Sequence, residues 1–271
     1  MMTARLRLGA LRSLRQAAGF AASLLLVLLW SVPETGAATL PETIKKLKPG
    51  IVAVGTYQKT RRPPAALKGT GFAVGRGKHI LTNAHVVDDR LDEENRERLA
   101  IFVGQGDSVE VRYATVLSRD AAHDVAVLGI EGNPLPVLKL GNDLSVEEGQ
   151  SVAFTGFPVG PVFGLYPATH RGIVSAISPI ALPQQSPRQL DVRMIKALRD
   201  RYDVFQLDAT AYPGNSGSPL YDPSSGAVYG MISSVFVKET KEKVLSDPSG
   251  ITYAIPIRHA RRLLDELGVP N

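Results

Sequence analysis

From about Thr39 onward, the chain consists of short β-rich apolar runs separated by glycine, proline and aspartate. This spacing is typical of β-barrels and β-sandwiches. Too few helices alternate with the runs to predict a parallel sheet, so the expected fold class is all-β. The segments predicted as strands are residues 51–57, 71–74, 79–81, 101–103, 109–116, 125–130, 152–157, 172–177, 204–208, 228–233 and 252–255.

Three segments favour helix: residues 41–47, residues 190–202 and the C-terminal residues 257–267. In the middle segment, apolar side chains recur every four residues, at Leu190, Met194, Leu198 and Tyr202. That period places them on one face of a helix. The region 184–203 therefore has two interpretations, an amphipathic insertion or a solvated surface loop with some helical content.

The first 38 residues have the pattern of an export leader. Four arginines precede an uncharged run at residues 17–32, and small residues follow at Gly36, Ala37 and Ala38. The run holds 16 residues, fewer than the roughly 20 that span a bilayer. Residues 1–38 are therefore interpreted as a signal peptide, with a retained N-terminal membrane anchor as the alternative.

The rest of the chain divides near residues 144–149, which separate two strand-rich halves. We expect one β-rich unit over residues 39–143 and a second over residues 144–271, the latter including the C-terminal helix. At 271 residues with 44% apolar content, the chain is long enough to bury a sizeable core.

Composition narrows the function classes. The formal net charge of +5 falls to +2 without the leader, because residues 1–38 hold four arginines and one glutamate. A nucleic-acid partner, which needs a basic surface on the folded domain, is therefore not expected. Cysteine is absent, so neither disulfides nor thiolate metal sites are expected. An exported location in a bacterium, periplasmic or at the cell surface, agrees with the leader and with the absence of cysteine.

The most informative local sequence is the glycine-rich stretch around Ser216, Pro213-Gly214-Asn215-Ser216-Gly217-Ser218. Glycines on both sides allow a sharp turn that points successive N–H groups at one spot, as an oxyanion hole requires. Taken alone, the stretch also fits an ordinary turn. It does not fit the nucleophile elbow of an α/β-hydrolase, because a β-hairpin follows and the only later histidine, His259, lies in a predicted helix.

Two further residues complement the serine. His85 ends the stretch Leu81-Thr82-Asn83-Ala84-His85, and a near-neutral imidazole is the base that a serine nucleophile needs. Asp124 opens an apolar strand and is suited to orient an imidazole. Each residue alone is ordinary, and it is the combination that points to a catalytic triad. A metal site at His123 and Asp124 is not expected, since neighbours on a strand face opposite ways.

In these stretches and their order, the sequence resembles the trypsin-like serine peptidases, and within them the Deg/HtrA group of exported bacterial proteases. The matching stretches are Gly69-Thr70-Gly71-Phe72, Leu81-Thr82-Asn83-Ala84-His85-Val86-Val87, Asp124-Val125-Ala126-Val127-Leu128, Gly172-Ile173-Val174-Ser175-Ala176, Gln206-Leu207-Asp208-Ala209, Gly214-Asn215-Ser216-Gly217 and Tyr253-Ala254-Ile255-Pro256.

The resemblance implies two six-stranded antiparallel β-barrels, over residues 39–143 and 144–271, with the active site between them. His85 and Asp124 would come from the first barrel and Ser216 from the second. The oxyanion hole would lie at residues 214–216, formed by the amides of Gly214 and Ser216 on either side of Asn215. Ser233 falls where the family has a serine that hydrogen-bonds the triad aspartate, although an ordinary strand serine is the alternative.

Substrate preference is also read from the resemblance. Thr210 occupies the position where relatives that prefer basic residues carry an aspartate, and Val235 and Phe236 would narrow the specificity pocket. We therefore expect cleavage after small aliphatic residues. Ser218 departs from the family pattern, which usually has glycine there. Deg proteases usually also carry a PDZ domain, and the sequence ends at Asn271 without one, so it is expected to be closer to a stand-alone protease domain.

The expected activity is hydrolysis of peptide bonds in exported or misfolded proteins through an acyl-enzyme, with polypeptides as partners. No cofactor, metal or nucleic acid is expected, and membrane contact only if the leader is retained. Trimers are common among Deg relatives, which leaves a homo-oligomer open. The alternative from another class is a protease-like binding or chaperone module with an idle site.

Overall fold

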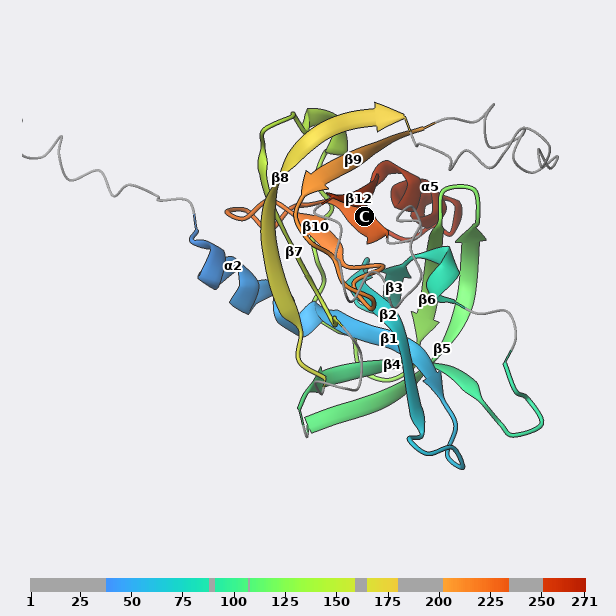
Figure 1. Cartoon of the computed structure of the whole chain (residues 1–271). Coiled ribbons are helices and arrows are strands. Elements are labelled where there is room, and N and C mark those ends of the chain that lie inside the picture. The colour runs from blue at the N-terminus through green and yellow to red at the C-terminus, as the bar shows by residue number, and fades with distance from the viewer. Residues whose placement is uncertain (1–37, 88–90, 107, 159–164, 180–201, 234–250) are drawn as a thin grey trace, which may run out of the picture. The chain divides into compact units, whose positions relative to one another are not determined.

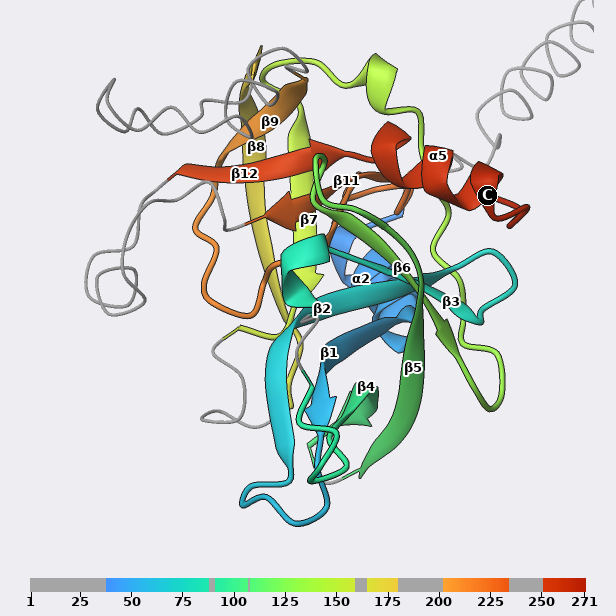
Figure 2. The same cartoon turned by 90° about the vertical axis from the view of Figure 1, so that its right-hand side faces the viewer.

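The computed structural model describes residues 38–87, 91–106, 108–158, 165–179, 202–233 and 251–271. Contacts between residues group the chain from Ala38 to Asn271 into one unit. Within this part, twelve strands form two closed antiparallel barrels of six strands each, as Figures 1 and 2 show. The prediction of an all-β fold with two six-stranded barrels is therefore confirmed.

The first barrel closes in the order β1-β2-β3-β6-β5-β4. Its interior is filled by aliphatic side chains from every strand, most of them branched, among them Val52, Ala73, Ile80, Ile101 and Leu128. Because β-branched residues pack well on a pleated surface, these runs favour strands over helices. Its strands are β1 (Ile51–Tyr57), β2 (Ala65–Val74), β3 (His79–Thr82), β4 (Arg98–Gln105), β5 (Ser108–Asp120) and β6 (Val125–Ile130).

The second barrel closes in the order β10-β11-β12-β9-β8-β7. Its core includes Phe154, Val174, Phe205, Leu207 and Leu220. Its strands are β7 (Ser151–Gly156), β8 (Ala168–Pro179), β9 (Asp203–Asp208), β10 (Pro219–Tyr221), β11 (Val228–Ser233) and β12 (Ile251–Pro256).

A third apolar cluster joins the two barrels. Phe72 of the first barrel and Tyr221 and Met231 of the second belong to it, and all three are almost completely buried. Leu47 of helix α2 (Leu40–Leu47) and Leu264 of helix α5 (Arg258–Glu266) complete it from outside the barrels. The barrels therefore share one continuous core, which fixes the two halves of any site formed between them.

The described residues include three short 3₁₀ helices: η1 (Lys48–Gly50) between α2 and β1, η2 (Ala84–Val86) after β3, and η3 (Asp143–Ser145) before β7. Helix α5 buries Ala260, Leu263 and Leu264 and contacts β5, β6 and β12, and Figure 2 shows it beside the ends of β6 and β12. Among the described residues, no helix has the length and apolar character needed to cross a membrane.

Most predicted strands agree with the structure, and the differences are local. Strand β2 begins at Ala65 rather than at residue 71, and β5 extends to Asp120. A β-hairpin was expected after Ser216, but no bounds were predicted for its first strand, β10, because a run of three residues carries no periodic pattern. The predicted helix at 190–202 lies outside the described residues except for Tyr202. The division into units at residue 144 stays a prediction.

Candidate active site

His85 and Asp124 lie side by side because β3 pairs with β6. The register places Thr82 opposite Ala126, so helix η2 after β3 meets the turn before β6. The Nδ1 atom of His85 lies 2.8 Å from Oδ2 and 2.9 Å from Oδ1 of Asp124. The His85 main-chain N–H also donates to Oδ1 at 2.9 Å. The carboxylate thus holds both the ring and the backbone of the histidine.

The backbone of Asp124 has an unusual conformation, with φ at 54° in the left-handed region. This conformation costs free energy in residues other than glycine, and it persists where surrounding contacts stabilise it. Here the buried Asn83 donates from Nδ2 to the Asp124 carbonyl at 3.0 Å. From the second barrel, Ser233 donates from Oγ to Oδ2 of Asp124 at 2.9 Å. The carboxylate therefore has partners from both barrels.

Ser216 lies in a tight turn before β10 and is 3% exposed. The turn is made possible by Gly214 and Gly217, whose φ angles are 97° and 86°. A Cβ atom on Gly217 would lie 2.0 Å from the Thr70 carbonyl oxygen, so a side chain at this position would collide with the neighbouring strand. We call residues 213–217 the oxyanion loop, after the role proposed for them below.

Thr70 on β2 connects the first barrel to this loop. Its main-chain N–H donates to the Ser216 carbonyl at 2.8 Å, and its hydroxyl donates to the Gly214 carbonyl at 2.8 Å. The same hydroxyl accepts a hydrogen bond from the Phe157 N–H at 3.0 Å. Thr70 is fully buried, and no individual role was predicted for it from its sequence neighbours.

Ser218, which stands where the resemblance predicts glycine, fits because Gly156 at the end of β7 has no side chain. The side chain of Ser218 is fully buried, and a Cβ atom on Gly156 would lie 1.9 Å from its hydroxyl oxygen. Gly156 thus leaves the space that the extra side chain occupies. Within the described residues, the hydroxyl of Ser218 and the side-chain amide of Asn215 have no hydrogen-bond partner.

Sequence comparison decides the family. The trypsin-like peptidase domain family matches residues 69–231, a range that includes His85, Asp124 and Ser216. The chain belongs to this family.

Relatives of the trypsin-like peptidase domain include bacterial and animal proteases. The chain is 34% identical over 199 residues to a "Probable periplasmic serine endoprotease DegP-like" of Halomonas elongata, covering 73% of this chain and 35% of the relative. It is 30% identical over 233 residues to human "Serine protease HTRA3", covering 84% and 44%. The chain thus spans less than half the length of these curated relatives.

Solved structures share the fold of the trypsin-like peptidase domain. The serine endoprotease from Yersinia pestis superposes with a TM-score of 0.58 at 23% identity, covering 85% of this chain and 66% of that one. The HtrA-type protease AlgW with a decapeptide gives a TM-score of 0.61 at 21% identity, with coverages of 84% and 67%.

The predicted specificity residues are only partly within the described structure. Thr210 is half-buried and follows β9. Thr252 of β12 hydrogen-bonds the residues immediately before and after it. The Thr252 hydroxyl donates to the Ala209 carbonyl at 2.6 Å and accepts from the Ala211 N–H at 3.0 Å. Sequence reasoning missed Thr252, since nothing local marks it. Val235 and Phe236 lie outside the described residues.

An aromatic and charged cluster lies behind Asp124 in the trypsin-like peptidase domain. His123 contacts Asp120 from Nδ1 at 2.6 Å, and its ring stacks on His259 of α5. Burial, followed by the charges of Asp124 and Asp120, raises the pKa of Tyr202, whose ring packs against both histidines. Among the described residues, no group of three ligand-type side chains could hold a metal ion.

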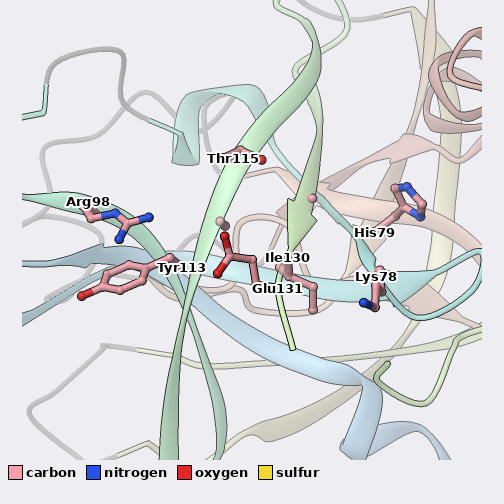
Figure 3. Close-up of a pocket in the computed structure, with 9 residues that line it drawn as sticks. Lys78, His79, Arg98, Tyr113, Thr115, Ile130 and Glu131 are labelled. Carbon is pink, nitrogen blue, oxygen red and sulfur yellow. The ribbon is translucent and has the colours of Figure 1, made fainter. Parts of the chain in front are cut away.

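A hollow on the first barrel lies away from these residues (Figure 3). It measures about 340 Å³, and the Arg98 guanidinium at its rim lies 3.7 Å from the centroid of the Tyr113 ring. None of His85, Asp124 or Ser216 lines it. The residues around it are Lys78, His79, Arg98, Tyr113, Ala114, Thr115, Gly129, Ile130 and Glu131.

Proposed function

We propose that this trypsin-like peptidase domain is a serine endopeptidase with His85, Asp124 and Ser216 as its catalytic triad. The observation that supports this most directly is the environment of the Asp124 carboxylate, which receives hydrogen bonds from His85 and Ser233. A carboxylate held in this way fixes one imidazole tautomer and stabilises the imidazolium that forms during reaction.

The proposed mechanism follows from which nitrogen of His85 is already engaged. Its Nδ1 atom faces Asp124, so Nε2 is the atom that takes the Ser216 proton as Oγ attacks the peptide carbonyl. The oxyanion would accept hydrogen bonds from the amides of Gly214 and Ser216, on either side of Asn215. His85 then returns the proton to the leaving amine, and water hydrolyses the acyl-enzyme.

The proposed substrates are exported or misfolded polypeptides, cut after small aliphatic residues. Curated relatives are named periplasmic serine endoproteases, which supports export and action on proteins outside the cytoplasm. The neutral side chain of Thr210 supports the exclusion of lysine and arginine from the pocket, which Val235 and Phe236 would narrow. A peptide series in which lysine or arginine is cleaved best would contradict this preference.

A fluorophosphonate probe, which reacts with activated serines, tests the activity. The wild type should be labelled and Ser216→Ala should not, and the substitution should lower kcat for a peptide substrate by roughly 10⁶-fold. Ser145→Ala is the matched control, because Ser145 is exposed on η3 and its hydroxyl donates only to Asn142. A folded but unlabelled wild type would instead support a binding or chaperone module.

A further inference from the structure

The oxyanion loop needs support from outside itself. Gly214 and Gly217 have φ angles that glycine reaches freely, but glycine also populates many other conformations, so the sequence of the loop does not fix its shape. An oxyanion hole works only when its N–H groups are held in place before the charge develops. The contacts that orient its peptide groups must therefore come from the residues around the loop.

Two peptide groups of the loop are held at both ends. The group between residues 214 and 215 has its carbonyl bound by the Thr70 hydroxyl and its N–H bound by the Tyr212 carbonyl at 2.9 Å. The group between residues 216 and 217 has its carbonyl bound by the Thr70 N–H and its N–H bound by the Ile232 carbonyl at 2.8 Å. Because a peptide group is planar, fixing both ends fixes its orientation.

The bonds from Thr70 draw both carbonyls toward β2. A carbonyl oxygen turned toward the reacting centre would repel the developing negative charge, so holding these oxygens on β2 favours the amide side of the loop facing the substrate. Within the described residues, the Gly214 N–H has no hydrogen-bond acceptor, as expected of a donor kept for the oxyanion.

We propose that Thr70 is the positioning residue of the oxyanion loop, a role that rests on the proposed protease function. Its hydroxyl both donates to the Gly214 carbonyl and accepts from the N–H of Phe157, the residue that follows β7. One side chain of the first barrel thus links the oxyanion loop to the segment after β7, and both belong to the second half of the chain. Thr70 does not touch the reacting atoms; it acts through Gly214 and Ser216.

The decisive variants are Thr70→Val and Thr70→Ser. Valine keeps the shape and the main-chain N–H but removes the hydroxyl, whereas serine keeps the hydroxyl. For Thr70→Val we expect kcat to fall on the order of 10²-fold, the scale of losing one oxyanion donor, with little change in KM. Thr70→Ser should recover most of kcat. If Thr70→Val does not fold, Thr70→Ala replaces it, with the same expected loss.

A pair of binding measurements separates positioning from general damage. A peptide boronic acid forms a tetrahedral adduct on the serine, and its affinity should fall with kcat in Thr70→Val. The corresponding peptide should bind Ser216→Ala and the double variant Ser216→Ala/Thr70→Val equally well. Equal losses for both ligands, or wild-type kcat and boronate affinity in Thr70→Val, would overturn the proposal.

Thr43→Val is the matched control for the lost hydroxyl. Thr43 on α2 is also buried, and its hydroxyl donates to the Ser224 carbonyl at 3.1 Å. This variant should lower the free energy of unfolding without changing kcat. Failure of the wild type itself to hydrolyse peptides or react with the probe would contradict the protease function, a result distinguishable from an active wild type that does not depend on Thr70.

Discussion

His123 and His259 lie face to face, with ring centroids 4.1 Å apart and ring planes 19° apart. His123 immediately precedes Asp124, and His259 belongs to the C-terminal helix α5. On the same helix, Arg262 contacts Oδ2 of Asp120 at 2.5 Å, the oxygen that also binds His123. Helix α5 is therefore packed directly against the turn that presents the proposed triad aspartate.

Two replacements of His259 test how much the stacked ring contributes to stability. His259→Ala should lower the free energy of unfolding by about 1–3 kcal/mol, because it removes a stacked aromatic and part of the apolar packing of α5. His259→Phe keeps a flat ring and should lie closer to the wild type. Urea unfolding followed by circular dichroism measures both, and equal stabilities of the two variants would contradict a role for the stack.

The pH dependence of stability gives a second prediction about His259. Burial, followed by the charges of His123, Arg258 and Arg262, lowers the pKa of His259 to about 4 against the opposing effect of Asp120. The folded protein thus binds this proton more weakly than the unfolded chain, whose pKa is about 6.5. The stability contribution is complete above pH 6.5 and is lost as the pH falls toward 4.

His259→Phe has no such proton to bind, so its stability should fall less than that of the wild type between pH 6.5 and 4. The comparison is needed because His170 also has a pKa lowered by burial and contributes a slope of the same sign in both proteins. Urea midpoints measured at half-unit pH intervals test the difference. Parallel curves for the two proteins would show that His259 does not titrate in this range.

Ser233 should matter for activity through its hydrogen bond to the proposed triad aspartate. Its buried hydroxyl donates to the Asp124 carboxylate at 2.9 Å, and a hydrogen bond to a charged group contributes about 1.5–3 kcal/mol. If this energy helps to hold the carboxylate against His85, Ser233→Ala should lower kcat/KM by roughly 10- to 100-fold. Steady-state kinetics with a fluorogenic peptide measure it, and an unchanged kcat/KM would leave Ser233 as an ordinary strand serine.

Local sequence patterns predicted most of the strands and marked the motif residues because each pattern is short, whereas the two barrels were implied by the family resemblance. A strand such as 125–130 is evident from its own apolar residues, and Asp124 and Ser216 are marked by their immediate neighbours. The fold class followed from the number and spacing of such runs together with the family resemblance. The bounds of strand β10 could not be predicted, because its three residues carry no pattern.

Partners far apart in the chain could not be predicted in this way. Thr70 and Gly214 are 144 residues apart, and only the packing of the two barrels brings them together. The same holds for His123 and His259, whose rings meet only through the packing of α5. The space that Gly156 leaves for Ser218 could not be predicted from the sequence either, since the neighbours of Gly156 are ordinary strand residues.

Two glycines offer a way to measure how tightly the oxyanion loop is packed. Gly149 and Gly217 have nearly the same φ, 85° and 86°. A Cβ atom on Gly149 would have no atom within 4 Å, whereas one on Gly217 would lie 2.0 Å from the Thr70 carbonyl oxygen. Alanine at either position pays the same backbone cost, about 1–2 kcal/mol, so any additional effect at Gly217 reports the contact with β2.

Gly149→Ala should therefore remain folded, react with the fluorophosphonate probe at the wild-type rate and lose only this backbone energy. Gly217→Ala should lose more than Gly149→Ala by urea unfolding, and its probe reactivity should fall even where it is folded, because the loop must move away from Thr70. The two variants measured side by side give the difference directly. Equal losses of stability with equal labelling would mean that the loop is free to shift, and that Thr70 does not constrain it.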